Sequence, residues 1–478
     1  MHCEILIIGA GPTGLGAATR LHEHGKSNWL LIDENSAPGG LASTDVTREG
    51  FLFDLGGHVI FSHYQYFDDL LSHAVGKNWN VLERVSFCWI KNQWVPYPLQ
   101  SNLYCLPLED KIACVRGLLT AKPRKCDTFD EWILSTMGEG LADLFMRPYN
   151  FKVWAYPTND MQCAWLGERV ATVDLPQVME NILRNKPSYG WGPNATFKFP
   201  KKGGTGGIWK KVCDLLPRRN LEFSKRLIAL DVEKKEAHFS DGSIVKYEKL
   251  LLTIPLDLTL KMTRKDEIAN RLNFSSTHVI GIGVRGVHNL GDKCWMYFSE
   301  DTTPFYRCTV FSNYAEENCP AESTLLPTLR KGGDEEFDAS MKPGPYWSLM
   351  FEVSESMHKP VDENTIVEET IAGAVRVGLF SEGSEIVSVY HRRLHRGYPT
   401  PHLNRDAALS EAEGFLRSHD IWSRGRFGAW KYEVSNQDHS LMQGVEAIDN
   451  ILFATEEMTL NHPDVTNKSR NTSLTYSK

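Results

Sequence analysis

The sequence contains neither a long apolar run nor a pair of cysteines at metal-binding spacing, and each absence excludes a class of protein. No stretch approaches the roughly 20 consecutive apolar residues that a transmembrane helix needs. The ten cysteines are scattered and form no C-x-x-C motif, which argues against a zinc site and against a disulfide framework. We therefore expect reduced thiols, no bound metal and a cytoplasmic location.

An excess of positive charge is also absent. The chain has 52 Lys and Arg residues against 60 Asp and Glu residues, which gives a formal net charge of -8. Nucleic acids and anionic membranes attract basic proteins, so we expect neither as a partner. An anionic small-molecule ligand would have to be held by a few local Arg or Lys side chains.

No internal repeat or low-complexity segment interrupts the 478 residues, a length that predicts two or three domains. Hydrophobic residues make up 42% of the chain and charged residues 23%, which is typical of a globular enzyme. The apolar residues close to the N-terminus predict a buried strand rather than a signal peptide. No basic segment precedes them and no small-residue cleavage site follows.

A glycine-rich turn follows that strand in the segment LIIGAGPTGLGAATRLHEHG, where Gly9, Gly11 and Gly14 form a G-x-G-x-x-G motif. This spacing permits a tight turn at the first glycine, a close approach of the backbone to a pyrophosphate at the second, and helix–strand packing at the third. The helix N-terminus that follows, with Pro12 and Thr13, would hold the diphosphate of a dinucleotide.

A second apolar run, residues 29–32, ends in Asp33, at the spacing from which an acid binds the ribose hydroxyls of a dinucleotide. A Gly-Gly pair comes soon after it. Alone this pair would fit an ordinary turn, but just past a ribose acid it resembles the FAD proteins of the glutathione-reductase and amine-oxidase types, and it favours FAD. The residues expected to contact the cofactor here are Asp33, Gly39, Gly40, Leu41 and Ala42.

The patterning predicts an α/β plus α+β fold, with a Rossmann-like FAD-binding domain assembled from discontinuous segments, a helical domain and an antiparallel β-sheet domain. The expected boundaries are 1–75, 200–265 and 420–478 for the FAD-binding domain, 104–190 for the helical domain, and 76–103 with 275–419 for the sheet and substrate domain. Asp127 or Thr128 is expected to cap a helix. Residues 421–456 predict a loop, a Gly-led segment and a strand, and 330–342 a solvated loop.

More specific segments extend over almost the whole chain. They are LGGHVIFS (55–62), RPYNFKVW (147–154), WLGERV (165–170), WGPN (191–194), GGTGG (203–207), FYR (305–307), GYPTP (397–401) and NQDH (436–439). Together they resemble the UDP-galactopyranose mutases of the eukaryotic, fungal-like type. The loop around 315–345 and the tail after about 463 match least.

The resemblance implies a redox-neutral isomerisation of UDP-galactopyranose and UDP-galactofuranose that requires reduced FAD, with NADPH as the reductant. In that family, N5 of the reduced flavin attacks the anomeric carbon and UDP leaves. The sugar ring then opens and closes at the other size before UDP returns. The product supplies galactofuranose for cell-surface glycans, including the cell wall. A homo-oligomer is compatible with the resemblance, and no residue pattern selects it over a monomer.

The resemblance also assigns roles to individual residues, of which His58, Arg169, Asn194 and Arg307 would be catalytic. The substrate-binding residues that it implies are Phe61, Tyr97, Gln100, Trp154, Arg169, Asn194, Trp295, Tyr297, Arg307, Tyr398, Arg426, Tyr432 and Asn436. To the cofactor-binding residues it adds Gly56, Gly57, His58, Gly203, Gly204, Gly207, Asn436, Gln437 and Ser440. Without the resemblance, Arg307 is the most informative of these residues, because an arginine in a strand among aromatic residues requires an anionic partner.

Two other functions are compatible with parts of the chain. An FAD-dependent amine or polyol oxidase of the same fold would share the N-terminal motifs, but it has no use for two phosphate-directed arginines. A binding protein like the GDP-dissociation inhibitors would have a similar fold and hold no flavin.

Overall fold

The computed structural model describes residues 1–189, 192, 195–321 and 343–477. Asn194, which the sequence analysis assigned to the substrate site, lies outside the described residues, and so does the segment 330–342 expected to form a loop.

A seven-stranded sheet carries the N-terminal motif. Its order is β10-β11-β12-β1-β2-β9, with β18 paired to β12. β1 pairs in parallel with β2 and β12, and its segment is apolar because both faces of the sheet are covered. The strands are β1 (His2–Ile8), β2 (Trp29–Ile32), β9 (Leu221–Glu222), β10 (Leu227–Asp231), β11 (Glu236–Phe239), β12 (Ile244–Leu252) and β18 (Ile421–Ser423).

Successive residues of β1 point to opposite faces of this sheet and enter different cores. Ile5 and Ile7 pack with α1, α2, α7 and α12, whereas Leu6 and Ile8 pack with α8, α9 and α11. The helices of the first core are α1 (Pro12–Glu23), α2 (Gln65–Val75), α7 (Gly204–Asp214) and α12 (Gln437–Phe453). Those of the second are α8 (Leu256–Met262), α9 (Asp266–Ala269) and α11 (Arg405–Ser418).

A second seven-stranded sheet runs in the order β17-β13-β16-β15-β14-β6-β7. The sequence analysis predicted an antiparallel sheet. This one is mixed, because β14 and β6 pair in parallel. Its strands are β6 (Ser86–Ile90), β7 (Gln93–Pro96), β13 (Phe274–Arg285), β14 (Trp295–Phe298), β15 (Arg307–Val310), β16 (Tyr346–Glu355) and β17 (Glu385–Pro399), and α10 (Ile366–Arg376) packs against it. Two-stranded sheets pair β3 (Thr44–Val46) with β4 (Leu52–Asp54), and β5 (Trp79–Glu83) with β8 (Thr196–Pro200).

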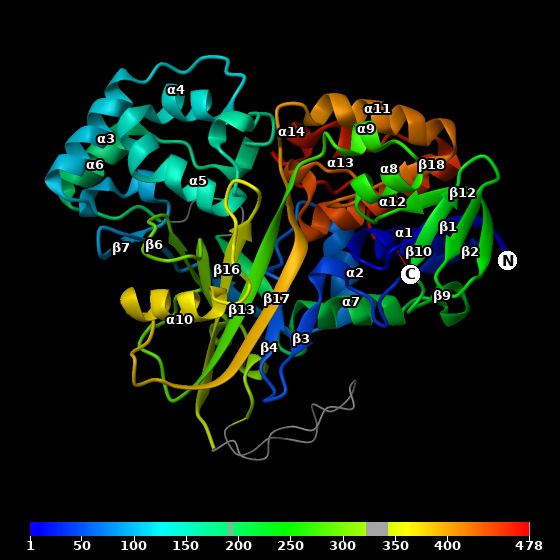
Figure 1. The fold of residues 1–478 in the computed structure, drawn as a ribbon, viewed down its shortest axis with the longest axis horizontal. Helices are drawn as coiled ribbons and strands as arrows, with labels where there is room; N and C mark the ends of the chain where they lie inside the picture. Colours follow the sequence, from blue (N-terminus) through cyan, green and yellow to red (C-terminus); the bar gives the residue numbers. More distant parts are fainter. Residues whose placement is uncertain (190–191, 193–194, 322–342, 478) are drawn as a thin grey trace.

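A helical region follows β7 in the chain. Thr128 caps the helix α4 (Phe129–Leu141) in a capping box with Glu131. Of the two residues predicted as the cap, Asp127 and Thr128, it is therefore Thr128. The other helices of this region are α3 (Leu108–Thr120), α5 (Arg147–Trp154) and α6 (Leu175–Arg184), and the short α13 (Met458–Asn461) and α14 (Pro463–Thr466) lie near the end of the chain. Figure 1 shows α3 to α6 and the N-terminal sheet on opposite sides of the long strands β13 and β17.

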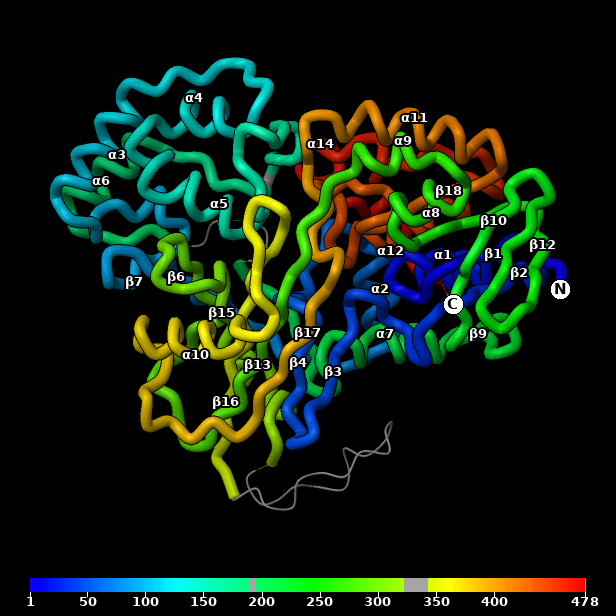
Figure 2. The backbone as a smooth tube through the Cα atoms, viewed as in Figure 1, coloured from blue at the N-terminus to red at the C-terminus, as the bar shows by residue number. Residues whose placement is uncertain are grey.

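Residues 421–456 were expected to form a loop, a Gly-led segment and a strand, but they begin with the strand β18 and end in a helix. The segment after Asn436 forms the helix α12 rather than a strand, because Leu441, Val445 and Ile448 follow the helical period and pack against α1. In the tube view this helix returns to the N-terminal sheet (Figure 2). A Cβ atom on Gly16 of α1 would lie 2.4 Å from the carbonyl oxygen of Leu441, so the two helices are in backbone contact.

All ten cysteines lie in the described residues, and none of them forms a disulfide. None of the helices in the described ranges has the length and apolar character that crossing a bilayer requires.

Candidate active site

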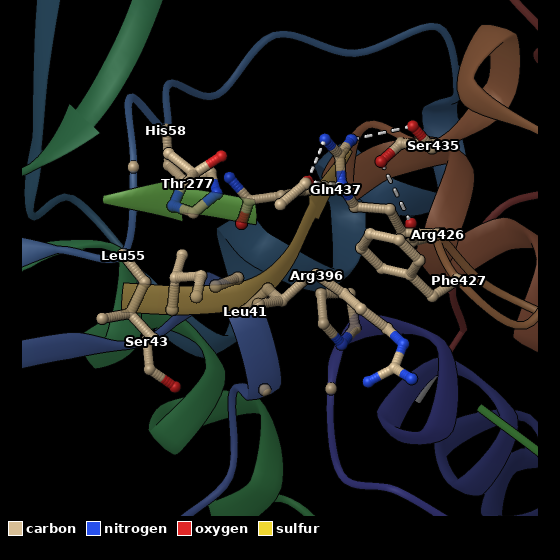
Figure 3. A pocket seen from close by; sticks show the side chains of 18 of the residues that line it. Leu41, Ser43, Leu55, His58, Thr277, Arg396, Arg426, Phe427, Ser435 and Gln437 are labelled. Atoms are coloured by element: carbon tan, nitrogen blue, oxygen red, sulfur yellow. Dashed lines mark hydrogen bonds between the residues drawn. The ribbon is translucent and has the colours of Figure 1, made fainter. Parts of the chain in front are cut away.

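A cavity of about 1220 Å³ lies between the N-terminal glycine turn and the second sheet. Figure 3 shows Leu41, Ser43 and Leu55 at one end of it and Arg426 with Ser435 at the other. Pockets for one small ligand typically enclose about 300–1,000 Å³. This cavity therefore has room for a dinucleotide and for part of a second ligand.

The glycine turn fits a dinucleotide. A Cβ on Gly14 would lie 1.8 Å from the carbonyl oxygen of Gly9, so the third glycine serves helix–strand packing. A Cβ on Gly11 would meet no atom closer than 3.8 Å, yet Gly11 lines the cavity at the N-terminus of α1. Its missing side chain leaves space for a ligand rather than for the protein's own atoms.

Asp33 ends β2 beside this turn. Its Oδ2 accepts a hydrogen bond from the amide of Ala10 at 2.6 Å, and its Oδ1 accepts from Asn35. A carboxylate oxygen can accept two hydrogen bonds, so Oδ2 keeps capacity for a ribose hydroxyl.

The Gly39–Ala42 turn lies directly against the first glycine turn. The amide of Gly39 donates to the carbonyl of Ala10 at 2.9 Å, and a Cβ on Gly40 would lie 3.3 Å from the Cα of Gly11. Gly40 lines the cavity. Gly39 lies outside the lining and has a positive φ of 127°.

The glycines at the start of α7 have a different role from the one expected. Gly203, Gly204 and Gly207 are absent from the cavity lining, and the neighbouring Gly206 is present in it. A Cβ on Gly204 would lie 2.5 Å from Oγ1 of Thr44. Gly204 therefore allows α7 to pack on the β3–β4 hairpin, whereas a Cβ on Gly203 or Gly207 would meet only the first turn of α7 and Lys202.

Asp54, at the end of β4, anchors the chain just before the Gly56–His58 loop. It is buried and accepts hydrogen bonds from the hydroxyl of Thr205 at 2.6 Å and from the hydroxyl of Thr44 at 2.5 Å. Burial raises the pKa of Asp54 to about 7.

His58 lines the cavity at the end of that loop. Burial, reinforced by the positive charge of Arg426, lowers the pKa of His58 to about 4, so the imidazole is neutral at physiological pH. Its Nδ1 is buried and has no hydrogen-bond partner among the described residues. A polar atom of this kind points to a ligand in the cavity.

Arg307 has the anionic partner that its place in a strand requires. It lies opposite Glu352 in the β15–β16 pairing and donates from Nε to Oε1 and from Nη2 to Oε2, each at 2.7 Å. Burial disfavours the charged form, but Glu352 together with the neighbouring Tyr398, Tyr306 and Tyr297 raises the pKa of Arg307 well above its usual value. Arg307 still lines the cavity, with 21% of its side chain exposed.

Arg169 reaches the cavity from a 3-10 turn, Gly167–Arg169. Its Nη1 donates to Oδ1 of Asn436 at 2.7 Å, and its guanidinium lies 5.4 Å from the ring centroid of Tyr432. Within the described part of the chain, Nε of Arg169 and Nδ2 of Asn436 are buried without hydrogen-bond partners. Two neighbouring donors are thus left for an acceptor on a ligand.

Arg426 brings a third guanidinium to the cavity. It donates to the hydroxyl of Ser435 and to the carbonyl of Gly397, both at 2.9 Å, and it lies 4.9 Å from the ring centroid of Tyr398. No carboxylate pairs with it among the described residues, and burial lowers its pKa. An anionic ligand would supply the missing negative charge.

The other predicted substrate residues divide into two groups. Tyr97 and Tyr297 line the cavity with ring centroids 4.8 Å apart, and Trp295 donates to the Tyr297 hydroxyl at 2.6 Å. Trp154 and Gln100 are absent from the lining: Trp154 packs behind Tyr432, and Gln100 is buried and donates to a backbone carbonyl. These two support the wall rather than form it.

The structure thus brings most of the predicted site together. The predicted residues that line the cavity are Gly9, Gly11, Pro12, Thr13, Asp33, Gly40, Leu41, Ala42, Gly56, Gly57, His58, Phe61, Tyr97, Arg169, Trp295, Tyr297, Arg307, Tyr398, Arg426, Tyr432, Asn436, Gln437 and Ser440. Those described but absent from the lining are Gly14, Gly39, Gln100, Trp154, Gly203, Gly204 and Gly207.

Many residues of the cavity wall were missed in the sequence, among them Glu352, Arg84 and Thr277. Glu352 was the most visible of them, because it is a lone acid in the apolar run YWSLMFEVSE and such an acid needs a partner. Arg84, with its guanidinium 5.4 Å from the Tyr97 ring centroid, and Thr277, on β13, carry no comparable signal.

Comparison with known proteins identifies the family. A model described as an NAD(P)-binding Rossmann-like domain matches residues 7–74. Among solved structures, a reduced UDP-galactopyranose mutase shares 46% sequence identity with the chain, with a TM-score of 0.91 and 99% of each chain covered. The chain belongs to the UDP-galactopyranose mutase family.

Other relatives of this mutase-family chain show the fold alone. Putrescine oxidase, studied for redesign of its cofactor binding, is 14% identical with a TM-score of 0.61, and covers 95% of this chain and 99% of its own. A fatty acid isomerase from P. acnes is 12% identical with the same TM-score, over 94% of this chain and 99% of its own. Sarcosine oxidase subunit alpha of Rhizobium meliloti (strain 1021) is 50% identical over 50 residues, which is 10% of this chain and only 5% of that relative's length. The findings support a flavin-dependent mutase. The oxidases are only distant relatives of the chain in sequence.

Proposed function

We propose that the protein interconverts UDP-galactopyranose and UDP-galactofuranose, as a UDP-galactopyranose mutase of the eukaryotic, fungal-like type that uses FAD reduced by NADPH. One observation supports this most strongly: Arg169, Arg307 and Arg426 line the same cavity as the dinucleotide-type glycine turn. Three guanidinium groups fit a diphosphate ligand, since arginine binds phosphate oxygens through paired hydrogen bonds. An amine or a polyol carries no negative charge for them to bind.

The cofactor would lie along the glycine turn, with its diphosphate at the N-terminus of α1 and a ribose beside Asp33. When bound and reduced, FAD supplies a nucleophilic nitrogen for the anomeric carbon. His58, neutral at physiological pH, adds no charge to this part of the cavity. Leu41 and Leu55 form an apolar wall that limits access of water.

The UDP-sugar would occupy the side of the cavity formed by the second sheet. Arg307 and Arg169 hold the diphosphate, and the hydroxyls of Tyr398 and Tyr432 supply further donors. Tyr97 and Tyr297 form the aromatic wall on this side. These residues would hold UDP after its bond to the sugar breaks. UDP then stays in position to return to the sugar.

The decisive experiment is to incubate dithionite-reduced protein with UDP-galactofuranose and to separate the nucleotide sugars by chromatography. We expect UDP-galactopyranose to form with reduced protein and not with oxidised protein. In a parallel reaction, NADPH should reduce the flavin but should not be consumed in proportion to the sugar converted. Stoichiometric NADPH oxidation, or no conversion by reduced protein, contradicts the proposal.

A further inference from the structure

Four hydrogen-bond donors from two parts of the chain, Gly57 and the pair Tyr306–Arg307, converge on the carboxylate of Glu352. Oε1 accepts from Nε of Arg307 at 2.7 Å and from the backbone amide of Gly57 at 3.0 Å. Oε2 accepts from Nη2 of Arg307 at 2.7 Å and from the Tyr306 hydroxyl at 2.6 Å. The Glu352 side chain is only 2% exposed, so these donors take the place of water.

This arrangement requires a carboxylate. Its two oxygens accept two hydrogen bonds each, which matches the four donors. A glutamine of the same size would replace one oxygen with an NH₂ group that faces other N–H or O–H groups. A buried donor without an acceptor is unfavourable, so the arginine, the loop or both would move.

The carboxylate also determines which edge of Arg307 faces a ligand. Nε and Nη2 are bound to Glu352, and no hydrogen bond from Nη1 is found in the described part of the chain. The guanidinium is planar and rigid, so binding one edge fixes the direction of the other. Nη1 is therefore the edge that remains for an anion in the cavity.

The same carboxylate holds the loop next to the proposed flavin position. Gly57 precedes His58, and its amide is bound to the oxygen that also binds Nε of Arg307. A Cβ on Gly57 would lie 2.7 Å from Nη2 of Arg307, so the loop and the guanidinium are in direct contact. A displacement of the loop would therefore also displace the guanidinium, and the reverse.

We propose that Glu352 is a positioning residue that sets the direction of Arg307 toward the diphosphate of the nucleotide sugar and, through the amide of Gly57, the place of the His58 loop. The inference rests on the proposed function for the identity of the ligand. It predicts that one carboxylate, whose two oxygens are both bound to donors of the protein, affects both UDP binding and turnover.

The first test compares Glu352→Gln with wild type as flavin-containing protein. UDP binding is measured by calorimetry, and kcat and KM are measured with UDP-galactofuranose. We expect UDP affinity to fall by about ten- to 100-fold, the range that one charge-assisted hydrogen bond gives, together with a lower kcat. Wild-type UDP affinity and kcat in Glu352→Gln would overturn the proposal.

A matched control separates this effect from the general cost of breaking an arginine–carboxylate pair. Asp449 accepts from Nε and Nη2 of Arg20 in the same two-point arrangement, with side chains 16% and 15% exposed, and neither residue lines the cavity. Asp449→Asn should lower the thermal stability and leave UDP affinity and kcat within about two-fold of wild type. Equal losses of UDP affinity in both variants would mean that Glu352 acts only through stability.

A double-mutant cycle provides the readout that a merely structural role would not change. If Glu352 acts on UDP through Arg307, then Glu352→Gln should cost little further UDP affinity, less than about two-fold, in an Arg307→Ala background. Losses that multiply in the double variant would refute the coupling.

If Glu352→Gln does not fold, Tyr306→Phe tests the same carboxylate with a smaller change, because it removes one donor and leaves three. We expect a two- to five-fold loss of UDP affinity, and no change would count against the proposal.

The controls also separate this inference from the proposed function. A wild-type protein that binds UDP but does not convert UDP-galactofuranose would refute the function and leave the binding cycle informative. An active wild type with an unaffected Glu352→Gln variant would refute the inference alone.

Discussion

The guanidinium of Arg307 occupies the place that a side chain at Gly57 would take: a Cβ there would lie 2.7 Å from Nη2 and 2.9 Å from Cζ of the arginine. Gly57 is therefore a glycine for reasons of space, and its φ lies outside the positive range. The contact joins the loop after β4 to a strand of the second sheet, β15.

Gly57→Ala should displace Arg307 or the loop and lower kcat/KM by about ten-fold or more, since overpacking of a tight contact costs about 1–3 kcal/mol. Steady-state kinetics with the reduced protein measures the effect. Gly414→Ala is the control, because Gly414 lies in α11 and a Cβ there meets nothing within 4 Å. That variant should keep its activity and gain up to about 1 kcal/mol of stability. Full activity in Gly57→Ala would mean that the contact is not needed.

Two glycines of the N-terminal motif should respond in opposite ways to substitution. Gly11→Val should fold with a thermal stability close to that of flavin-free wild type but bind no flavin, because the added atoms enter the cavity and not the protein. Gly14→Ala should instead lose stability, because its Cβ would lie 1.8 Å from the Gly9 carbonyl oxygen. The flavin absorbance per protein and the melting temperature of each purified variant test both statements. A yellow Gly11→Val protein would place the cofactor elsewhere.

The two diphosphate-directed arginines should differ in their effect on UDP binding. Arg307 lies on β15 and is already oriented by Glu352, so it loses little freedom when a ligand binds. Arg307→Ala should weaken UDP binding by roughly ten- to 150-fold, the equivalent of about 1.5–3 kcal/mol. Arg169 lies on a short 3-10 turn, and its replacement by alanine should weaken binding less and lower turnover more. Titration of UDP against both variants decides the order, and wild-type affinity in both would show that the diphosphate binds elsewhere.

The titration of His58 should appear in the dependence of stability on pH. The pKa of His58 is about 4 in the folded protein, below the value of about 6.5 for an exposed imidazole. Between these two values the unfolded chain binds a proton that the folded protein does not bind, so stability falls as the pH is lowered through this window. The full effect is on the order of 3 kcal/mol, at 1.36 kcal/mol per pKa unit.

The measurement for His58 is the melting temperature of wild type and of His58→Gln at several pH values in that window. The variant has no group that titrates at this position, so the stability of wild type relative to His58→Gln should decline toward acid pH. Other buried groups titrate in both proteins and cancel in the comparison. Parallel curves would show that the pKa of His58 is not lowered.

The sequence alone determined the nucleotide-binding turn, because all the parts of that motif are local. Gly9, Gly11, Gly14 and Asp33 lie within a single strand–helix–strand unit, and the backbone freedom that each position needs follows from its spacing. The longer motifs of the resemblance predicted the family and most of the cavity wall in the same way. The strand expected at the end of residues 421–456 was wrong because a long-range contact decided the structure there, namely the packing of α12 on α1.

Only the tertiary structure decided how the charged groups are paired. The sequence shows that Arg307 needs an anion, but its partner lies 45 residues away and became its neighbour through the register of β15 and β16. A shift of that register by one residue would turn Glu352 to the other face of the sheet. The third contact, with Gly57, lies 295 residues from Glu352 in the chain. Such contacts depend on how whole sheets pack, and short-range residue patterns do not contain that information.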